Sequence, residues 1–342
     1  GLTTSVAGRV VASNGQAVEN AEIVLDNGIT EMLKATQSGA AGQFAFSNTP
    51  MHYNYNISGK KNDDYLNGVS TLDLVLIQRH VLALNRLTDV YNIIAADVNN
   101  DEKVTASDLV ELRKLILGIF TELPKSGSWR FIDKTQVFGD VNNPWPIRER
   151  VYIDDLSYAM TNQDFVGVKV GDVNGSATGN FNTAATDSRS IVTLTSDNVE
   201  LAANKVVPVT FSANTDNVYG LQFTLTLNNA DLTDVYVGGK ALAESNIAKI
   251  AENMYTVSWN DVQAVNGSEL ITLNVVSKTD AKASSVISVG SAVTSAEIYS
   301  GAELNTAKLS LRFAGDDTFA VFQNEPNPFN DKTTISFNLP AA

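Results

Sequence analysis

The chain has 342 residues, with 38 Asp and Glu against 24 Lys and Arg and a formal net charge of -14. This acidic balance argues against nucleic acid and anionic membranes as partners, since both need a basic face. The chain has no cysteine, which excludes disulfide scaffolds, thiolate zinc sites and cysteine nucleophiles. No apolar run approaches the roughly 20 residues of a membrane span, and the length allows two or three domains.

Residues 1–60 predict a small β domain. Short alternating runs bounded by turn residues indicate half-buried strands at Ala21–Leu25, Gly42–Phe46 and Tyr53–Ile57. The run Gly8-Arg9-Val10-Val11, with the segments 15–21 and 39–46, resembles the carboxypeptidase-regulatory-like β-sandwich. That family usually serves as a spacer or stalk, so the resemblance implies a sandwich without chemistry of its own.

Residues 61–118, the first part of a predicted unit 61–180, contain an internal repeat. Val69–Ile77 matches Val104–Leu112 at an offset of 35 (104 minus 69). In both copies a polar loop ends in Asp and leads into apolar residues at helical spacing, and the second run closes on Gly118, a C-terminal cap. The repeat predicts two loop–helix units that form a calcium-binding helical pair.

The second loop has the oxygen ligands that calcium requires. Oxygen-bearing side chains fall at its first, third, fifth, ninth and twelfth places, and the seventh place supplies a backbone carbonyl. The candidate ligands are Asp97, Asn99, Asp101, Lys103, Thr105 and Asp108. Glu102 occupies the place where a Gly normally makes the sharp turn. A metal-free polar turn is the alternative.

The first loop is less complete. The same offset gives the candidate ligands Asn62, Asp64, Gly68, Ser70 and Asp73, but Leu66 occupies the fifth place. One alternative is a one-residue slip that uses Asp63 or Asn67. Another is that Asp172 and Asn174, in a later Gly-Asp-Val-Asn-Gly segment, complete the site from outside. We therefore expect calcium in one loop or in both.

Two such units in tandem resemble the dockerin module. The resemblance implies two calcium ions and a cohesin domain as the partner, bound through the helices. Carried over to this chain, the partner-binding residues are Thr71, Leu72 and Arg79 of the first unit and Ala106, Ser107 and Lys114 of the second. Ordinary solvated helix positions are the alternative for all six.

The segment 119–180 has no clear periodicity and many aromatic residues. A structureless loop of this length is improbable in a compact domain, so we expect an irregular extension that wraps the helical pair. Residues 181–189 are poor in large apolar side chains and predict a linker.

Residues 190–313 predict a second β-sandwich, because several of their strands alternate apolar and polar residues. The order of Val206–Phe211, Asn217–Phe223, Val257–Trp259 and Leu270–Leu273 resembles cohesin domains, jelly-roll-type sandwiches that receive dockerins. Trp259 lies in an alternating strand, which favours a core position over a sugar-binding one. The fold class is thus mainly β and multidomain, with a helical pair between two sandwiches.

Residues 316–342 contain the run Gln323-Asn324-Glu325-Pro326-Asn327-Pro328-Phe329-Asn330. It resembles the start of the C-terminal sorting domain of type IX secretion in the Bacteroidetes lineage. The resemblance implies export to the cell surface or the medium. The chain starts at Gly1 without a signal-like segment, which indicates a processed or shortened chain.

An enzyme is the least favoured class, since only His52 and His80 are available and no triad or zinc constellation is visible. The leading hypothesis is a secreted, non-catalytic, calcium-stabilised assembly protein. Its helical pair would dock on the sandwich of the next copy, giving a head-to-tail filament, or on a module of another chain. The alternative is part of a surface adhesin or carbohydrate-active protein whose second sandwich binds glycans.

Overall fold

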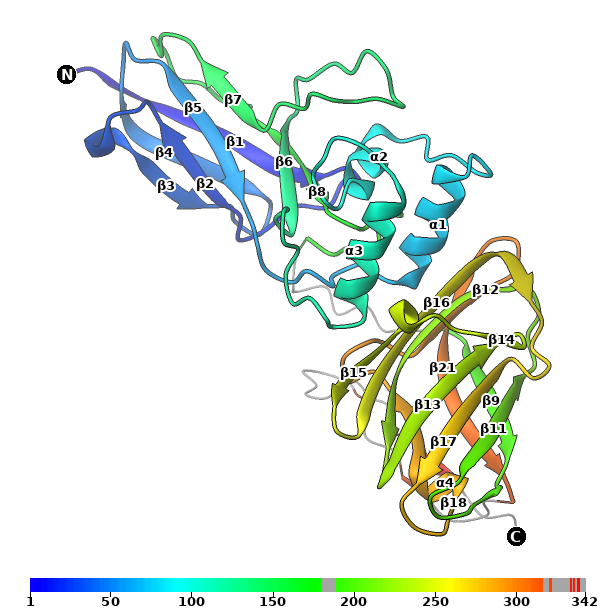
Figure 1. Ribbon diagram of the computed structural model, residues 1–342. Helices are drawn as coiled ribbons and strands as arrows, with labels where there is room; N and C mark the ends of the chain where they lie inside the picture. Colours follow the sequence, from blue (N-terminus) through cyan, green and yellow to red (C-terminus); the bar gives the residue numbers. More distant parts are fainter. Residues whose placement is uncertain (180–188, 316–319, 322–332, 334, 336, 339–342) are drawn as a thin grey trace.

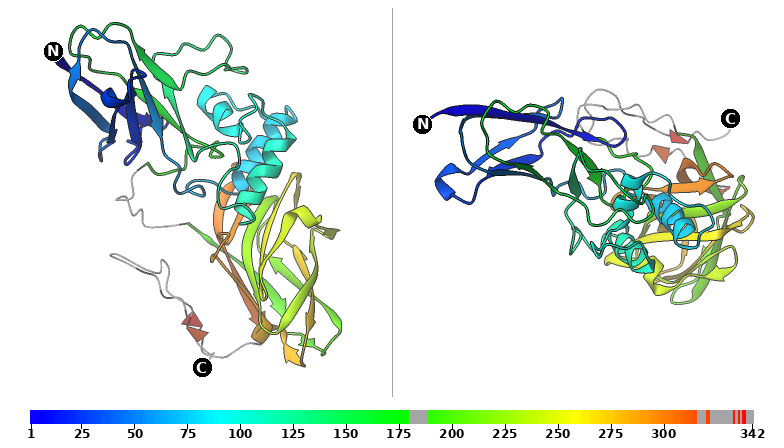
Figure 2. Two further views of the ribbon diagram at one scale, coloured as in Figure 1. Left: turned by 60° about the vertical axis from the view of Figure 1, so that its left-hand side comes forward. Right: turned by 90° about the horizontal axis from the view of Figure 1, so that it is seen from above.

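The computed structural model describes residues 1–179, 189–315, 320, 321, 333, 335, 337 and 338. The chain is mainly β-structure and forms three parts (Figure 1): a first sandwich, a helical pair and a second sandwich. The two further views in Figure 2 also place the helices between the sandwiches. None of the described helices is long and apolar enough to span a membrane.

The first sandwich consists of two four-stranded sheets, with the strand orders β4-β1-β8-β6 and β3-β2-β5-β7. The pairings are antiparallel except that of β1 with β8, which is parallel. Its strands are β1 (Thr3–Ala12), β2 (Glu22–Asp26), β3 (Lys34–Gln37), β4 (Gln43–Pro50), β5 (Tyr55–Lys60), β6 (Trp129–Asp133), β7 (Arg150–Ile153) and β8 (Phe165–Lys169).

Three strands of the first sandwich lie beyond the helices in sequence. Strands β6, β7 and β8 come from residues 129–169, so the helical pair is an insertion into the sandwich. This corrects the expected domain boundary after residue 60 and the expectation of an irregular extension. Without β7 and β8, strands β5 and β1 would expose their unpaired backbone groups at sheet edges. Strand β6 could not be predicted from the sequence, because all five of its residues are buried and its apolar and polar residues do not alternate.

Aromatic side chains of this later segment fill the core of the first sandwich. Phe131 and Phe165 pack edge to face with ring centroids 6.5 Å apart, and Phe44 lies 6.4 Å from Phe165. Gly59 of β5 is required at this contact, because a Cβ there would lie 2.7 Å from the Phe131 ring. Burying one Phe is worth roughly 1.5–3 kcal/mol, so residues 1–60 depend on the later strands for much of their core.

The helical pair consists of α1 (Thr71–Val81) and α3 (Ala106–Ile116), as the repeat predicts, with a further short helix, α2 (Val90–Ala96). Both α1 and α3 begin with a capping box, formed by Ser70 with Asp73 and by Thr105 with Asp108. The sequence analysis did not predict α2. Its signal is Asp89, whose carboxylate accepts the N–H of Tyr91 at 2.8 Å and caps the helix.

In the second sandwich, eleven strands form one sheet that folds over its own core (Figure 1), and two short strands, at residues 200–201 and 281–282, pair separately with each other. Trp259 is 8% exposed and belongs to this core. The strands are β9 (Ile191–Asp197), β10 (Glu200–Leu201), β11 (Val206–Ala213), β12 (Val218–Leu227), β13 (Ala230–Val237), β14 (Lys240–Ala241), β15 (Ile247–Ala251), β16 (Met254–Val265), β17 (Ile271–Ser277), β18 (Ala281–Lys282), β19 (Ile287–Gly290), β20 (Glu297–Ser300) and β21 (Asn305–Ala314), with a short helix α4 (Ala283–Val286).

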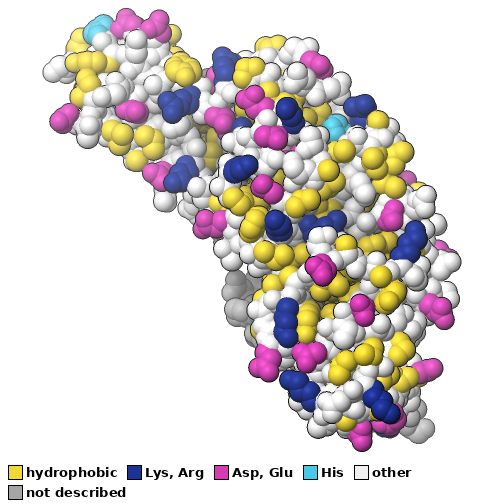
Figure 3. Space-filling model, in the orientation of Figure 1, with side chains coloured by type: hydrophobic (Ala, Val, Ile, Leu, Met, Phe, Trp, Pro, Cys, Tyr) yellow, Lys and Arg dark blue, Asp and Glu magenta, His cyan; other side chains and the backbone are white. Residues whose placement is uncertain are grey.

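Residues 180–188, which include nearly all of the predicted linker, lie outside the described residues. So does most of the predicted sorting segment, of which the structure describes only β22 (Ala320–Val321), β23 (Phe337–Asn338) and two single residues. On the face shown in Figure 3, acidic and basic side chains are interspersed over all three parts. The acidic balance of the chain is therefore not gathered in one patch on that face.

Candidate functional site

Residues 97–108, called the continuous loop, join α2 to α3 around the carboxylate of Asp97. This carboxylate accepts the N–H of Asp101 at 3.0 Å and the N–H of Glu102 at 3.1 Å. Glu102 has a φ of +63°, so it adopts the left-handed turn for which Gly is the usual residue at this place. The sharp turn is therefore formed despite the departure seen in the sequence.

Asp108 closes the same loop from the other end. One of its oxygens accepts the N–H of Val98 at 2.8 Å, and the other accepts the N–H of Thr105, also at 2.8 Å. Asp97 and Asp108 are both fully buried. These bonds close the loop between Asp97 and Asp108.

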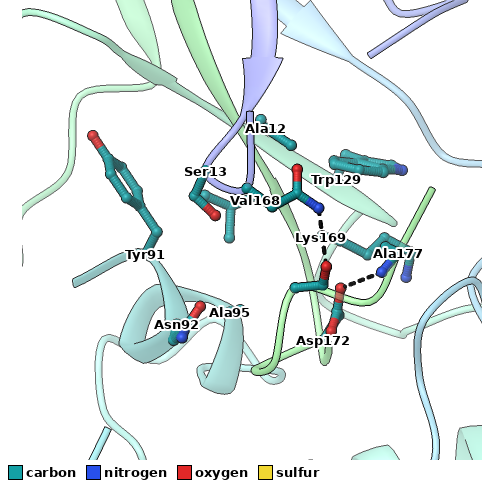
Figure 4. A pocket seen from close by; sticks show the side chains of 13 residues that line it. Ala12, Ser13, Tyr91, Asn92, Ala95, Trp129, Val168, Lys169, Asp172 and Ala177 are labelled. Atoms are coloured by element: carbon teal, nitrogen blue, oxygen red, sulfur yellow. Dashed lines mark hydrogen bonds between the residues drawn. The ribbon is translucent and has the colours of Figure 1, made fainter. Parts of the chain in front are cut away.

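The second candidate site is assembled from two distant segments, 68–73 and 172–177, which together are called the split loop. Asp172 accepts the N–H of Ser176 at 3.1 Å and the N–H of Ala177 at 2.8 Å, and the second of these bonds is drawn in Figure 4. These are the fourth and fifth residues after Asp172, as Asp101 and Glu102 are after Asp97. Asp172 therefore occupies the first place of a loop that has no continuous sequence.

Asp73 closes the split loop as Asp108 closes the continuous loop. It accepts the N–H of Val173 at 2.9 Å and the N–H of Ser70 at 2.9 Å. The bond from Val173 to Asp73 is equivalent to the bond from Val98 to Asp108, at an offset of 75 for the donors (173 minus 98). The bond from Ser70 to Asp73 is equivalent to the bond from Thr105 to Asp108, at an offset of 35 (105 minus 70). The hydrogen-bond pattern of the continuous loop is thus reproduced across a gap of about a hundred residues.

Ser176 takes the fifth place, which the sequence analysis left to Leu66. Its hydroxyl donates to the carbonyl of Gly68 at 3.0 Å, whereas Leu66 is 40% exposed. The residue at the first place accepts the backbone N–H groups of the loop, and this residue is Asp172. The side chain of Asn62, the candidate for this place, instead lies against Gly127. Asp64 faces Lys169, Asp63 and Lys61 electrostatically and makes no described bond to the split loop. Asp172 and Asn174, which the sequence offered as one alternative, thus lie in the split loop together with Asp73.

Burial raises the pKa of the buried loop carboxylates. It raises the pKa of Asp97 to about 6, against the lowering effect of the loop amides and of Arg130. Burial also raises the pKa of Asp108, and burial with the neighbouring Asp172 raises that of Asp73 well above its usual range. Buried carboxylates are costly unless a cation compensates them. Arg130 supplies part of this compensation at Asp97, and Lys169 supplies part of it at Asp73.

The donor set of each loop is mixed. Among the described residues, no group of three or more His, Cys, Asp or Glu side chains gathers at one point. Amide, hydroxyl and backbone carbonyl oxygens must therefore complete any site, and calcium accepts all of these. A pocket of about 20 Å³ beside the split loop, lined by Lys169 and Trp129 (Figure 4), has room for a water molecule.

We expect the calcium affinity of the continuous loop to weaken about tenfold between pH 7 and pH 5, because a proton competes with the ion for Asp97. Without calcium, the folded chain binds more protons at Asp97 than the unfolded chain between about pH 3.9 and pH 6, so this group lowers the free energy of unfolding as the pH rises through that interval. Calcium titrations at pH 5, 6 and 7 measure the affinity. Equal affinities at pH 5 and pH 7 would contradict this expectation.

The N-terminal end of α1 is bound to the second sandwich. The N–H of Thr71 donates to Oε1 of Gln222 at 2.6 Å, and its hydroxyl hydrogen-bonds that of Ser258 at 2.7 Å. All three residues are buried. The first amides of a helix have no carbonyl partner within it, so the sandwich supplies an acceptor that α1 lacks.

Asn260 of β16 lies between the two helices. Its Nδ2 donates to Gln78 of α1 at 2.6 Å, and its Oδ1 accepts from Nη2 of Arg113 on α3, also at 2.6 Å. Gln78 and Arg113 are equivalent in the repeat at the offset of 35 (113 minus 78). Arg113 Nη1 also donates to the carbonyl of Ser258 at 2.7 Å. One side chain of the sandwich is thus held by the same position of both helices.

The C-terminal end of α3 is capped by hydroxyls of the second sandwich. Thr294 donates to the carbonyl of Ile116 at 2.6 Å, and Thr256 donates to that of Leu117 at 2.7 Å. The last carbonyls of a helix have no amide partner within it. Gly118 follows with a φ of +73°, and a Cβ there would lie 2.7 Å from Val293. The predicted C-cap is therefore also a point of close approach to the sandwich.

Apolar and cation–π contacts complete this docking face, which consists of α1 and α3 against β12 and β16. Val75 is 1% exposed, and a Cβ on Gly220 would lie 3.2 Å from it. The guanidinium of Arg79 lies 4.6 Å from the centre of the Tyr219 ring. The docking that was expected between copies is therefore present within one chain.

The two repeats contribute unequally to the docking face. Of the predicted partner-binding residues, Thr71 and Arg79 contact the second sandwich and Leu72 is half-buried. Ala106 and Ser107 are exposed, and Lys114 lies over Phe120. The sequence analysis missed Val75, Gln78 and Arg113. The repeat could have indicated the last two, since it aligns two polar residues on the same face of both helices.

Comparisons with known proteins agree with parts of this description. Residues 64–117 match the Dockerin type I domain, and no curated protein matches the chain. Solved structures similar to the chain include a chain of a type I cohesin–dockerin complex from Clostridium thermocellum (12% identity, 37% of this chain and 93% of that chain, TM-score 0.28). Others are CaCohA2 from Clostridium acetobutylicum (13%, 36% and 92%, 0.27) and a non-cellulosomal cohesin from Archaeoglobus fulgidus (17%, 36% and 86%, 0.26).

Proposed function

We propose that the chain is a secreted, non-catalytic, calcium-stabilised assembly protein whose copies link head to tail by exchanging the docked helical pair. Dockerin and cohesin modules are non-catalytic modules of protein–protein assembly. The observation that carries the proposal is the docking face itself. A dockerin-like helical pair lies on a sandwich of the same chain through buried, specific bonds such as those of Thr71 and Arg113.

Exchange between copies needs no contact beyond those seen within one chain. The helical pair precedes residues 180–188 in the sequence, and the second sandwich follows them. These nine residues can span at most about 30 Å, and this length limits how far the two parts can separate during exchange. If the helices of one copy occupy the sandwich of the next, the same hydrogen bonds form between two chains. Such a contact is heterologous, and a heterologous contact that does not close on itself gives a filament.

Calcium is the cation that we assign to the two loops. The continuous loop would hold it through Asp97, Asn99, Asp101, Thr105, Asp108 and the carbonyl of Lys103. The split loop would hold it through Asp172, Asn174, Ser176, Ser70, Asp73 and the carbonyl of Gly68. Bound calcium would compensate the buried carboxylates. Thr71 lies between Ser70 and Asp73 in sequence, so the split loop also positions the first residue of the docking face.

The location outside the cell is part of the proposal. Dockerin modules occur in extracellular proteins. The motif that resembles a type IX sorting domain, residues 323–330, supports export by that route, and it lies outside the described residues. The absence of cysteine is compatible with this location, because metal and a large core can replace disulfides as sources of stability.

Assembly is tested with the full chain in calcium and in chelator. Light scattering coupled to size exclusion, over a range of concentrations, should show oligomers whose mass grows with concentration in calcium and falls in chelator. Electron microscopy of the same samples should show unbranched filaments. A chain that stays monomeric at high concentration, with and without calcium, would refute the exchange.

A further inference from the structure

The continuous loop has a basic neighbour that comes from outside the helical pair. Arg130 lies on β6 of the first sandwich and is 7% exposed. Its Nε and Nη2 donate to Glu149 at 3.0 and 3.2 Å. Its remaining nitrogen, Nη1, is buried without a hydrogen bond and lies 3.5 Å from Oδ2 of Asp97.

This arrangement directs one positive charge at the first ligand of the loop. Glu149 holds two of the three guanidinium nitrogens, so Nη1 is fixed in the direction of Asp97. Asp97 is fully buried, and a buried carboxylate needs a cation nearby. Because Arg130 lies outside residues 64–117, this charge is supplied by the strand that the sandwich places beside the loop.

A guanidinium at this position has two opposite effects on a calcium loop. Without calcium it compensates Asp97, whose carboxylate holds the N–H groups of Asp101 and Glu102, so the loop can stay closed. With calcium, a positive charge a few ångströms from the ion repels it. In a water-like medium this repulsion changes an affinity by roughly tenfold.

We propose that Arg130 is a resident counter-cation of the continuous loop, which keeps the loop closed in the absence of calcium and weakens its affinity for calcium. The first effect needs only the contacts described above. The second rests on the proposed calcium in this loop. Together they predict a loop that keeps its shape when calcium is scarce and loads only at the high concentrations typical of extracellular modules.

Hydrogen exchange of the peptide that spans residues 97–108 reads this loop separately from the split loop. In the full chain with Arg130→Met, the amides of residues 97–108 should exchange faster than in wild type when chelator is present. Calcium should protect the same amides at a concentration about tenfold lower than in wild type. Arg130→Lys keeps the charge and should resemble wild type. The matched control is Arg148→Met, since Arg148 also lies 3.5 Å from a carboxylate, that of Asp133, but its side chain is 49% exposed.

Each outcome decides a part of the proposal. It is overturned if Arg130→Met leaves both exchange and calcium response unchanged, if it weakens calcium binding, or if Arg148→Met has the same effect. If wild type does not respond to calcium, the proposed calcium role fails, and exchange in chelator still decides whether Arg130 closes the loop. If Arg130→Met folds only with calcium, the closing role is supported. If it does not fold at all, rapid exchange of the wild-type peptide in chelator overturns that role.

Discussion

Arg113→Ala is expected to weaken the docking of the helical pair on the second sandwich by about 2–4 kcal/mol. Arg113 donates to Ser258 and Asn260 from a half-buried position, and burial lowers the pKa of its guanidinium to about 10. Truncation removes these charge-assisted bonds and takes from Oδ1 of Asn260 this donor, whereas the carbonyl of Ser258 keeps its bond from Asn246. Native-state hydrogen exchange of α3 and β16 measures the free energy of opening this contact.

The control for this variant is the next residue along the helix. Lys114 is a basic residue on the same helix, but it lies over Phe120 and makes no described bond to the second sandwich. Lys114→Ala should therefore leave the opening free energy within about 0.5 kcal/mol of wild type. An effect of Lys114→Ala as large as that of Arg113→Ala would contradict the docking face as described.

Asp172→Ala is expected to remove one bound calcium ion and to lower the free energy of unfolding in calcium by about 2–4 kcal/mol. Asp172 is the first place of the split loop, where it accepts the N–H groups of Ser176 and Ala177. Without it the segment 172–177 has nothing to close around, and Asp73 remains buried without its cation. Calorimetric titration gives the number of ions, and denaturant unfolding gives the stability.

Asp140 provides a matched control, because Asp140-Val141-Asn142 repeats the residues of the split loop in another context. Asp140 accepts the N–H of Asn142 at 2.9 Å in an exposed turn. Asp140→Ala should change neither the number of calcium ions nor the stability beyond about 0.5 kcal/mol. Two ions bound by Asp172→Ala would show that the split loop is not a calcium site.

The parts that the sequence could predict are those encoded within a short stretch. The closing Asp73 and Asp108 and the apolar residues at helical spacing after them predicted α1 and α3, and Gly118 predicted the end of the second helix. The Asp-Val-Asn-Gly segment at 172–175 could be matched to the start of a loop because its residue types are specific. Its role in the split loop could be proposed only because Leu66 left a place unfilled.

The parts that the sequence could not predict depend on pairings between distant residues. Strand β6 has no alternation because both of its faces are buried, so its membership of the first sandwich has no local signal. The docking of Thr71 on Gln222 joins residues 151 positions apart. Module resemblance predicted that helices and sandwich would meet but not whether they would do so within a chain. Arg130 was not singled out, since its role comes only from the position of β6 beside the continuous loop.

The central claim, that the docked pair is exchanged between copies, is tested most directly by disulfide trapping. The chain has no cysteine, and the hydroxyls of Thr71 and Ser258 are 2.7 Å apart, so Thr71→Cys and Ser258→Cys place two thiols within reach of a disulfide. Each single variant is first kept in chelator. The two are then diluted together into calcium and oxidised. Tyr152→Cys, at an exposed position on the first sandwich, replaces Thr71→Cys as the control for random collision.

Exchange predicts a covalent dimer of the Thr71→Cys and Ser258→Cys chains that the control mixture does not form. If the mixture gives no dimer while the double variant closes within a single chain, the docked pair is not exchanged and the claim is wrong.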